Sequence, residues 1–129
     1  MVRESLAANA RYGYMLLTPT VGDFEYRTTT GGSAAPSSQT NATVTPPRYM
    51  KITRAGDVLS GYHSVDGLTW TLMRTVTLTG LPTSVYIGLA VTSHADGLIA
   101  TGVFDTVSNG VPVASTKFGP PLNLVFVQN

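Results

Sequence analysis

Short runs of alternating apolar and polar residues dominate the chain, and residues that favour turns separate them. Apolar side chains recur at every second position within these runs, while Gly, Pro, Asn and Asp gather between them. This spacing is typical of antiparallel β-strands in a sandwich or barrel, and no stretch keeps a helical period. The pattern predicts an all-β chain with strands at Arg11–Thr18, Asp23–Thr28, Arg48–Arg54, Asp57–Ser64, Leu68–Leu78, Ser84–Ser93, Ile99–Ser108 and Leu122–Val127.

The clearest local unit is a predicted hairpin around the dipeptide Asp66-Gly67. Such a pair between two β-runs favours a two-residue turn, which would place Leu59 opposite Arg74 and His63 opposite Trp70. Strand alternation then puts one set of side chains on a single, buried side. We expect that set to comprise Trp70, Leu72, Val76 and Leu78.

Composition and charge narrow the possible partners. Charged residues make up 12% of the 129-residue chain, and eight basic and seven acidic side chains give a net charge of +1. The basic residues are scattered, and nucleic acid is not expected as a partner, because binding it requires a cluster of basic groups. No apolar run is long enough to cross a bilayer, so no membrane association is expected. The chain contains no cysteine and shows no signal peptide, so any export signal would lie upstream.

Several segments together resemble a known family. "VRESLA", "TPTVGDFEYRTTTGG", "PPRYMKITRAGDVLSGYHSVDGLTWT", "VYIGLAVTSHADG" and "ATGVFDTVS" occur in an order similar to that of a concanavalin A-like β-sandwich family. Its members include bacterial domains of the regulation-of-enolase-like branch, which accompany glycan-related modules in large exported proteins. The resemblance implies a jelly-roll sandwich of antiparallel strands and an extracellular or cell-surface location within an exported parent protein.

The chain departs from this family at both ends. Family members carry several more strands before the "RESL" segment, and residues 109–129 do not resemble the family. We therefore expect a truncated sandwich domain over residues 1–108 and an atypical tail over 109–129, which could supply one extra strand. An incomplete sandwich leaves strand edges unpaired. The strand around Arg3 and Glu4 is accordingly expected to take a neighbour from the tail or from a second copy, giving a homodimer joined through sheet edges.

Charged residues on the predicted strands form the first candidate site. Glu25 and Arg27 share one side of their strand, and Arg3 and Glu4 lie near the start of the chain. Burying such charges is costly unless they are paired. Two interpretations stay open: an ion-pair arrangement on a solvated face, or a polar concave groove for a hydroxyl-rich ligand.

The two histidines and the single tryptophan are the other candidates. His63 and His94 are the only histidines, and His94 lies near Ser93 and Asp96 as a nucleophilic hydrolase would require. No G-x-S-x-G nucleophile motif accompanies them, and a histidine in a polar loop is the commoner situation. Trp70 could stack on a sugar ring if exposed, but its alternation favours the core.

These observations favour a non-catalytic binding module over an enzyme. We expect a carbohydrate ligand on the polar face, with Arg3, Glu4, Glu25, Arg27, His63 and His94 as ligand-binding residues, no catalytic residues and no cofactor. Calcium remains an alternative because relatives of this sandwich bind it, although no loop is acidic enough to name ligands. Two other functions stay open: a small hydrolase acting on an ester, lactone or glycosidic bond, and a structural interaction module without a small-molecule ligand.

Overall fold

The computed structural model describes residues 1–36 and 43–109, which divide into two units. Met1–Gly88 form the first unit and Leu89–Asn129 the second. All strands of the described residues lie in the first unit, and no helix occurs among them. The prediction of an all-β chain built from antiparallel strands is confirmed. The predicted strand Leu122–Val127 and the tail from 110 onward lie outside the described residues.

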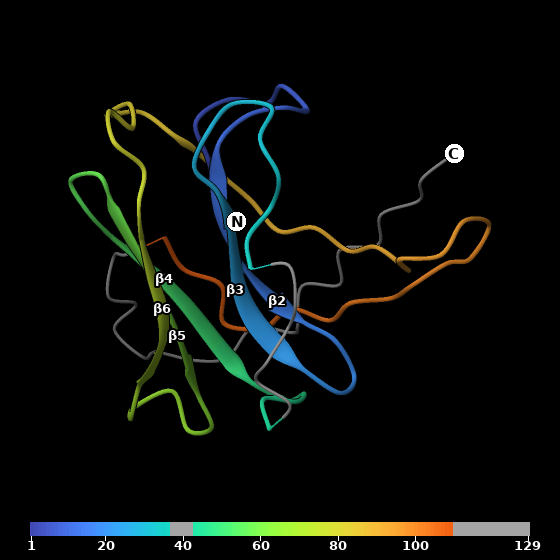
Figure 1. Ribbon diagram of the computed structural model, residues 1–129. Helices are drawn as coiled ribbons and strands as arrows, with labels where there is room; N and C mark the ends of the chain where they lie inside the picture. Colours follow the sequence, from blue (N-terminus) through green and yellow to red (C-terminus); the bar gives the residue numbers. More distant parts are fainter. Residues whose placement is uncertain (37–42, 110–129) are drawn as a thin grey trace. The chain divides into compact units, whose positions relative to one another are not determined.

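Two antiparallel sheets make up the first unit (Figure 1). One sheet has the order β3-β2-β1-β7 and the other the order β4-β5-β6. Their strands are β1 Val2–Arg3, β2 Tyr12–Leu17, β3 Gly22–Arg27, β4 Tyr49–Ala55, β5 Val58–Ser64, β6 Thr71–Thr77 and β7 Tyr86–Ile87. Strands β2 to β6 lie within three residues of the predicted ranges, because alternation and turn residues are local signals.

The strand at the start of the chain finds both of its neighbours in the same unit. Val2 pairs with Gly13 of β2 on one side and with Ile87 of β7 on the other. The expectation that this strand would take its neighbour from the tail or from a second copy is therefore wrong. A backbone hydrogen bond of 3.2 Å from the Gly88 N–H to the Met1 carbonyl extends the pairing with β7.

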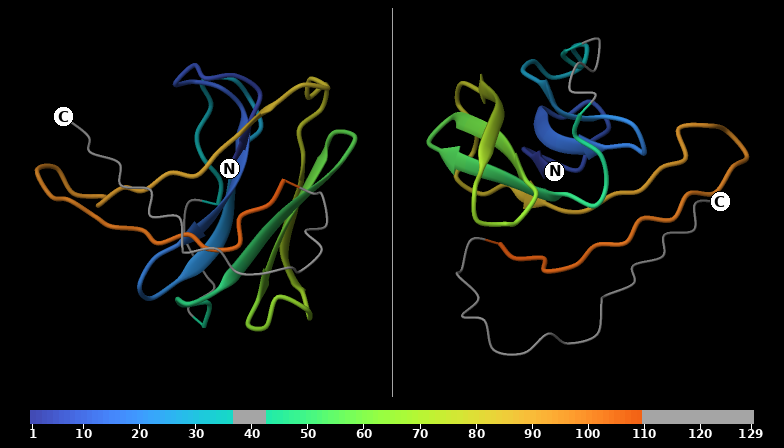
Figure 2. Two further views of the ribbon diagram at one scale, coloured as in Figure 1. Left: turned by 180° about the vertical axis from the view of Figure 1, so that it is seen from behind. Right: turned by 90° about the horizontal axis from the view of Figure 1, so that it is seen from below.

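The apolar core lies between the two sheets. Phe24 of β3 is fully buried, as are Leu59 of β5 and Leu78 just after β6. Val2, Val76 and Leu81 complete the buried cluster, and Met15, Ile52 and Met73 pack against it. The side of each sheet that faces this cluster is called its inner face below, and the opposite side its outer face. The two views of Figure 2 show the strands of the two sheets as separate groups.

The second unit contains no strand in its described part, residues 89–109. The predicted strand Ile99–Ser108 is therefore wrong, and the predicted strand Ser84–Ser93 is reduced to Tyr86–Ile87. The chain does turn back on itself between these two segments, since a Cβ built on Gly102 would meet the Val91 side chain at 2.7 Å. At the turn, His94 and Gly97 have positive φ angles of 56° and 74°. The two arms lie close without a ladder of hydrogen bonds among the described residues.

Candidate functional site

Three of the expected ligand-binding residues meet on the outer face of the four-stranded sheet. Arg3 and Arg27 lie opposite Tyr12 from the strands on either side of it. Their guanidinium carbons are 5.8 Å and 5.0 Å from the centre of the Tyr12 ring, close enough for cation–π attraction. Glu25 lies in the next row, opposite Tyr14. Glu25 and Arg27 are two residues apart in the sequence, which predicted that they share one side of their strand. The structure confirms that they do, within a cluster of polar groups.

The two arginines of this cluster donate hydrogen bonds to backbone carbonyl groups. Arg3 reaches the Ala7 carbonyl at 2.6 Å, and Arg27 reaches the carbonyls of Ala8 and Ala10 at 3.0 Å and 3.3 Å. These carbonyls belong to the loop that joins β1 to β2. The guanidinium groups therefore hold this loop over the sheet. Both Arg27 hydrogen bonds come from Nη1, and its Nε is buried with no partner.

Glu25 takes part in a short hydrogen bond on the same face. The Tyr14 hydroxyl donates to the Glu25 carboxylate at 2.6 Å. Burial is the main cause that raises the pKa of Tyr14, and the neighbouring carboxylate adds to it. Tyr14 therefore keeps its proton and remains a donor to Glu25 across the physiological pH range.

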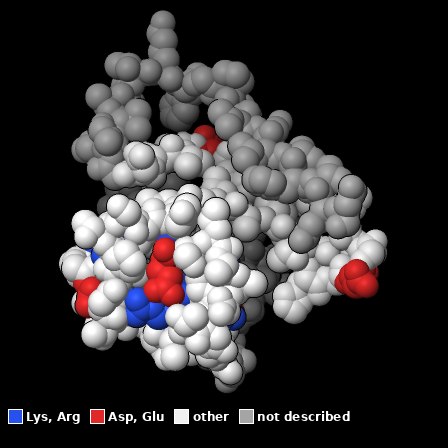
Figure 3. Space-filling view, turned by 90° about the horizontal axis from the view of Figure 1, so that it is seen from above, with Lys and Arg blue, Asp and Glu red and all other residues white. Residues whose placement is uncertain are grey.

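Glu4 lies apart from this cluster, beside Arg11. Its carboxylate accepts hydrogen bonds from the Arg11 backbone N–H at 3.1 Å and from the guanidinium at 2.6 Å, and Thr30 adds a third. The backbone hydrogen bond is the main cause that holds the pKa of Glu4 below its usual range. Figure 3 shows acidic and basic side chains in contact on the face that it draws. Glu4 and Arg11 therefore form a structural ion pair.

His63 occupies the inner face of the three-stranded sheet. Its neighbour Tyr62 is on the outer face, and its Nδ1 atom is buried with no hydrogen-bond partner. Burial is the main cause that lowers the pKa of His63, and the positive charge of Arg48 adds to it. His63 therefore stays neutral near neutral pH, and it lies on a different sheet from Arg3, Glu25 and Arg27.

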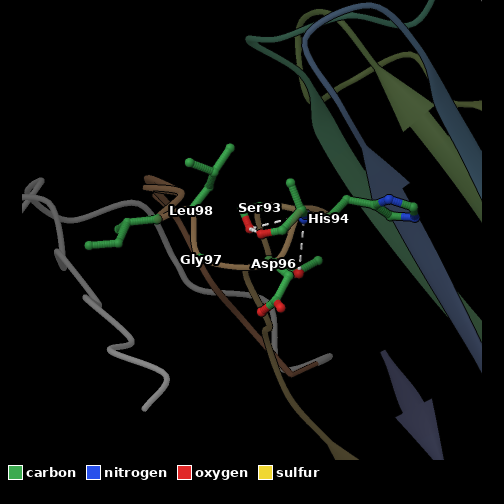
Figure 4. A pocket seen from close by; sticks show the side chains of 8 residues that line it. Ser93, His94, Asp96, Gly97 and Leu98 are labelled. Atoms are coloured by element: carbon green, nitrogen blue, oxygen red, sulfur yellow. Dashed lines mark hydrogen bonds between the residues drawn. The ribbon is translucent and has the colours of Figure 1, made fainter.

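His94 belongs to the turn of the second unit. Figure 4 shows its imidazole pointing away from both Ser93 and the Asp96 carboxylate. The Ser93 hydroxyl donates instead to the Ala95 carbonyl at 2.7 Å. The hollow at this turn is lined by residues 92–99 alone, so no other element contributes a side chain to it. These three residues do not have the geometry of a nucleophile activated by a base.

A second cluster, which includes two residues predicted for the core, covers the outer face of the three-stranded sheet. Lys51 of β4 lies opposite Tyr62 of β5. Its ammonium is 5.0 Å from the centre of the Tyr62 ring and 4.0 Å from that of Trp70. Tyr49 and Leu72 share this face and are 45% and 53% exposed. We call the five residues Tyr49, Lys51, Tyr62, Trp70 and Leu72 the aromatic face.

The prediction that Trp70 and Leu72 belong to the core is wrong, and a β-bulge is the reason. Gly61 pairs with Arg74, but the next residue, Tyr62, pairs with Leu72, so that Met73 is an extra residue in β6. One extra residue reverses the side on which the following residues lie. Val76 and Leu78, on the far side of the bulge, are buried as predicted.

One signal in the sequence could have indicated this bulge. Gly61 interrupts the middle of the predicted strand, and a glycine inside a strand often marks a bulge or a close approach of backbone. Both occur here, since a Cβ on Gly61 would lie 2.5 Å from Phe24. Trp70, considered from the sequence as a possible platform for a sugar ring, is half-buried on the outer face with the Lys51 ammonium over its ring.

The turn next to the aromatic face is organised by Asp66. Its Oδ1 accepts hydrogen bonds of 2.8 Å from the Ser64 hydroxyl and from the backbone N–H groups of Leu68 and Thr69. The two backbone hydrogen bonds are the main cause that lowers the pKa of Asp66 to about 2. Gly67 has a φ of 73°, and the Tyr49 ring lies against it. The loop runs from Val65 to Trp70 and is longer than the two residues predicted.

Neither a metal cluster nor a membrane-spanning helix is found in residues 1–36 and 43–109. No group of three or more His, Asp or Glu side chains in these residues could hold a metal ion. No helix there is long and apolar enough to cross a membrane.

Comparisons with known proteins add no relative. No family model matches the chain, and neither a curated protein nor a solved structure matches it.

Proposed function

We propose that the chain is a non-catalytic carbohydrate-binding module and that the aromatic face is its binding surface. The observation that carries this proposal is the position of Tyr62 of β5 and of Trp70, the residue just before β6, on the outer face beside Lys51. An aromatic ring offers a flat apolar surface on which the C–H groups of a sugar ring can pack, while its polar edge remains in water.

The rest of the aromatic face has properties that suit such a ligand. The strands beneath it also carry hydroxyl groups on the same side, and those of Ser60 and Thr75 lie 3.0 Å apart and exposed. Sugars present hydroxyl groups around an apolar ring plane, so a surface combining rings and hydroxyls matches both parts. The face is formed by paired strands and therefore needs little ordering when it binds, which limits the entropic cost.

Affinity gel electrophoresis of the full chain on soluble polysaccharides tests the proposal. We expect at least one polysaccharide to retard the wild-type protein, and Trp70→Ala to remove the retardation while the far-ultraviolet circular dichroism spectrum is kept. Glu25→Gln on the other sheet is the matched control and should leave retardation unchanged. Retardation that depends on Glu25 and not on Trp70 would move the binding surface to the four-stranded sheet. No retardation on any polysaccharide would contradict carbohydrate binding.

The concanavalin A-like jelly roll, the bacterial origin and the extracellular location are proposed with this function. Their support is the order of the motifs from "VRESLA" to "ATGVFDTVS". The two antiparallel sheets are compatible with a sandwich of this family. An experimental structure with a strand order foreign to jelly rolls would contradict the family assignment.

Self-association is a second candidate function, favoured by one edge of the four-stranded sheet. Strand β7 is an edge strand in the described sheet, and its Tyr86 and Ile87 are 52% and 69% exposed. The opposite edge, β3, is partly covered by a bridge between Tyr26 and Ala35. An exposed apolar edge can pair with the same edge of a second copy. Sedimentation of a dimer that Ile87→Lys dissociates would support this candidate, and a compact monomer at micromolar concentration would contradict it.

A further inference from the structure

The charge of the aromatic face comes from a single residue. At the strand positions of this face, Lys51 is the one ionisable side chain besides the tyrosines, and no Asp or Glu accompanies it. The two ion pairs found within residues 1–36 and 43–109, Arg11–Glu4 and Arg74–Asp23, both lie elsewhere. The Lys51 ammonium therefore has no carboxylate partner in the described part of the chain.

Two rings fix the position of this ammonium. The Lys51 Nζ lies over both rings, 4.0 Å from the centre of the Trp70 ring and 5.0 Å from the centre of the Tyr62 ring. Cation–π attraction of this kind holds a flexible lysine in one place but satisfies none of its three N–H donors. The donors remain available to an acceptor that approaches from the solvent.

Asp66 forms no ion pair with Lys51 in the described part of the chain. Asp66 lies in the turn between β5 and β6, and its Oδ1 already accepts three hydrogen bonds from that turn. Those bonds orient the carboxylate toward its own loop. A ligand that binds the aromatic face would therefore meet a positive charge over its two rings.

We infer that the aromatic face selects anionic sugars, whose rings carry a carboxylate or a sulfate ester, over neutral sugars. The anionic group accepts hydrogen bonds from Lys51 over the two rings, and the sugar ring packs against the part of the aromatic face that the ammonium leaves open, where Tyr49 and Leu72 are exposed. This inference rests on the proposed carbohydrate binding and adds the class of ligand. A charge-assisted hydrogen bond at an exposed site favours the anionic ligand by up to about fivefold in affinity.

Isothermal titration of the full chain with matched ligand pairs tests this inference. Trigalacturonate and its methyl ester contain the same sugar, but only the first carries carboxylate charges. A sulfated galactan and its desulfated form make the corresponding comparison for sulfate esters. We expect the wild-type protein to prefer one of the anionic members by up to about fivefold. The arm that shows the preference identifies the anionic group. The preference should also weaken with added salt, since an exposed charge pair is screened.

Two substitutions at Lys51 separate its charge from its shape. Lys51→Met keeps an unbranched apolar stem and should remove the preference, whereas Lys51→Arg keeps the charge and should retain it. Equal affinity of the wild-type protein for both members of each pair would overturn the inference, as would a preference that survives in Lys51→Met.

The outcome also distinguishes this inference from the proposed function. Binding of neutral and anionic sugars with equal affinity, abolished by Trp70→Ala, would overturn the charge selection and leave carbohydrate binding in place. Absence of binding to all four ligands, together with no retardation on polysaccharide gels, would overturn both.

Discussion

The backbone of Gly61 lies directly against the ring of Phe24 in the core. A Cβ atom built on Gly61 would come within 2.5 Å of Phe24 Cδ2 and 2.6 Å of the Met15 sulfur. Phe24 is fully buried, so its ring cannot move without displacing other core side chains. A hydrogen atom at this position is therefore a condition for the two sheets to approach each other.

Gly61→Ala should accordingly destabilise the fold. Overpacking of a filled core costs about 1–3 kcal/mol, and urea denaturation followed by circular dichroism measures it. Gly88→Ala is the matched control, because no atom lies within 4 Å of the Cβ it would add, and it should change stability by less than about 0.5 kcal/mol. Equal stability of the two variants would contradict the packing described for Phe24.

Asp57 should be needed to hold the loop after β6. Its carboxylate accepts hydrogen bonds from the backbone N–H groups of Gly80 at 2.7 Å and Leu81 at 3.1 Å. Asp57→Ala removes both acceptors, and we expect a loss of about 1–2 kcal/mol in the free energy of unfolding. Asp105→Ala, an exposed change of the same kind in the second unit, should have little effect. A wild-type stability in Asp57→Ala would show that water replaces both bonds without cost.

His63 should make stability fall as the pH drops below about 6.5. Its pKa is lowered in the folded protein, so below the ordinary histidine pKa the unfolded chain binds a proton that the folded chain does not. Stability is then lost progressively from about pH 6.5 down to the folded pKa. Chemical denaturation between pH 5 and 8 should show this slope, and His63→Gln should remove it. The same slope in His63→Gln, or its loss in the exposed variant His94→Gln, would contradict this assignment.

Asp66 should affect the pH dependence of stability at a lower pH than His63 does, and its stabilising contribution should be lost between about pH 4 and pH 2. Its pKa is about 2 in the folded protein against an ordinary value of 3.8, so its ionised form is stabilised by folding. This contribution is present above about pH 4 and is lost as the pH falls toward 2. Asp66→Asn should therefore be less stable than the wild type at pH 6, and the difference should shrink by pH 2. Asp96→Asn serves as the control, and a difference that does not change with pH would contradict the role given to the charge.

The sequence predicts well where most strands begin and end, because that signal is local. It predicts less well which segments pair with a neighbouring strand in a sheet. Strands β2 to β6 follow from alternation and turn residues, and the parity of Glu25 and Arg27 predicted that they share a face. The residues around Ile99 have the alternation of a strand but none of its hydrogen bonds among the described residues. Alternation reports which side chains could be buried, whereas a strand also requires a partner backbone at the right place.

The sequence could not predict what the charged residues contact, because those contacts join segments that are separated in the chain. Arg3 and Arg27 are residue types common in ligand sites, but they donate hydrogen bonds to the carbonyls of a loop that folds back over the sheet. Trp70 was placed on the wrong side because one extra residue, Met73, lies between it and the core residues of its strand. Both errors have the same origin. The groups that these residues contact are brought to them by the fold, and they do not lie next to them in the sequence.

The bulge at Met73 also uncouples the facing of Trp70 and Leu72 from the length of their strand. Removing Met73 would place Leu72 directly next to Arg74 and still opposite Tyr62, so Leu72 would stay on the outer face. A straight strand that kept Met73 would instead pair it with Tyr62 and turn Leu72 inward. The extra residue is not idle, because its side chain packs against the buried cluster. One inserted residue thus adds a core contact on one side of the sheet and leaves the side chains of the other side where they are.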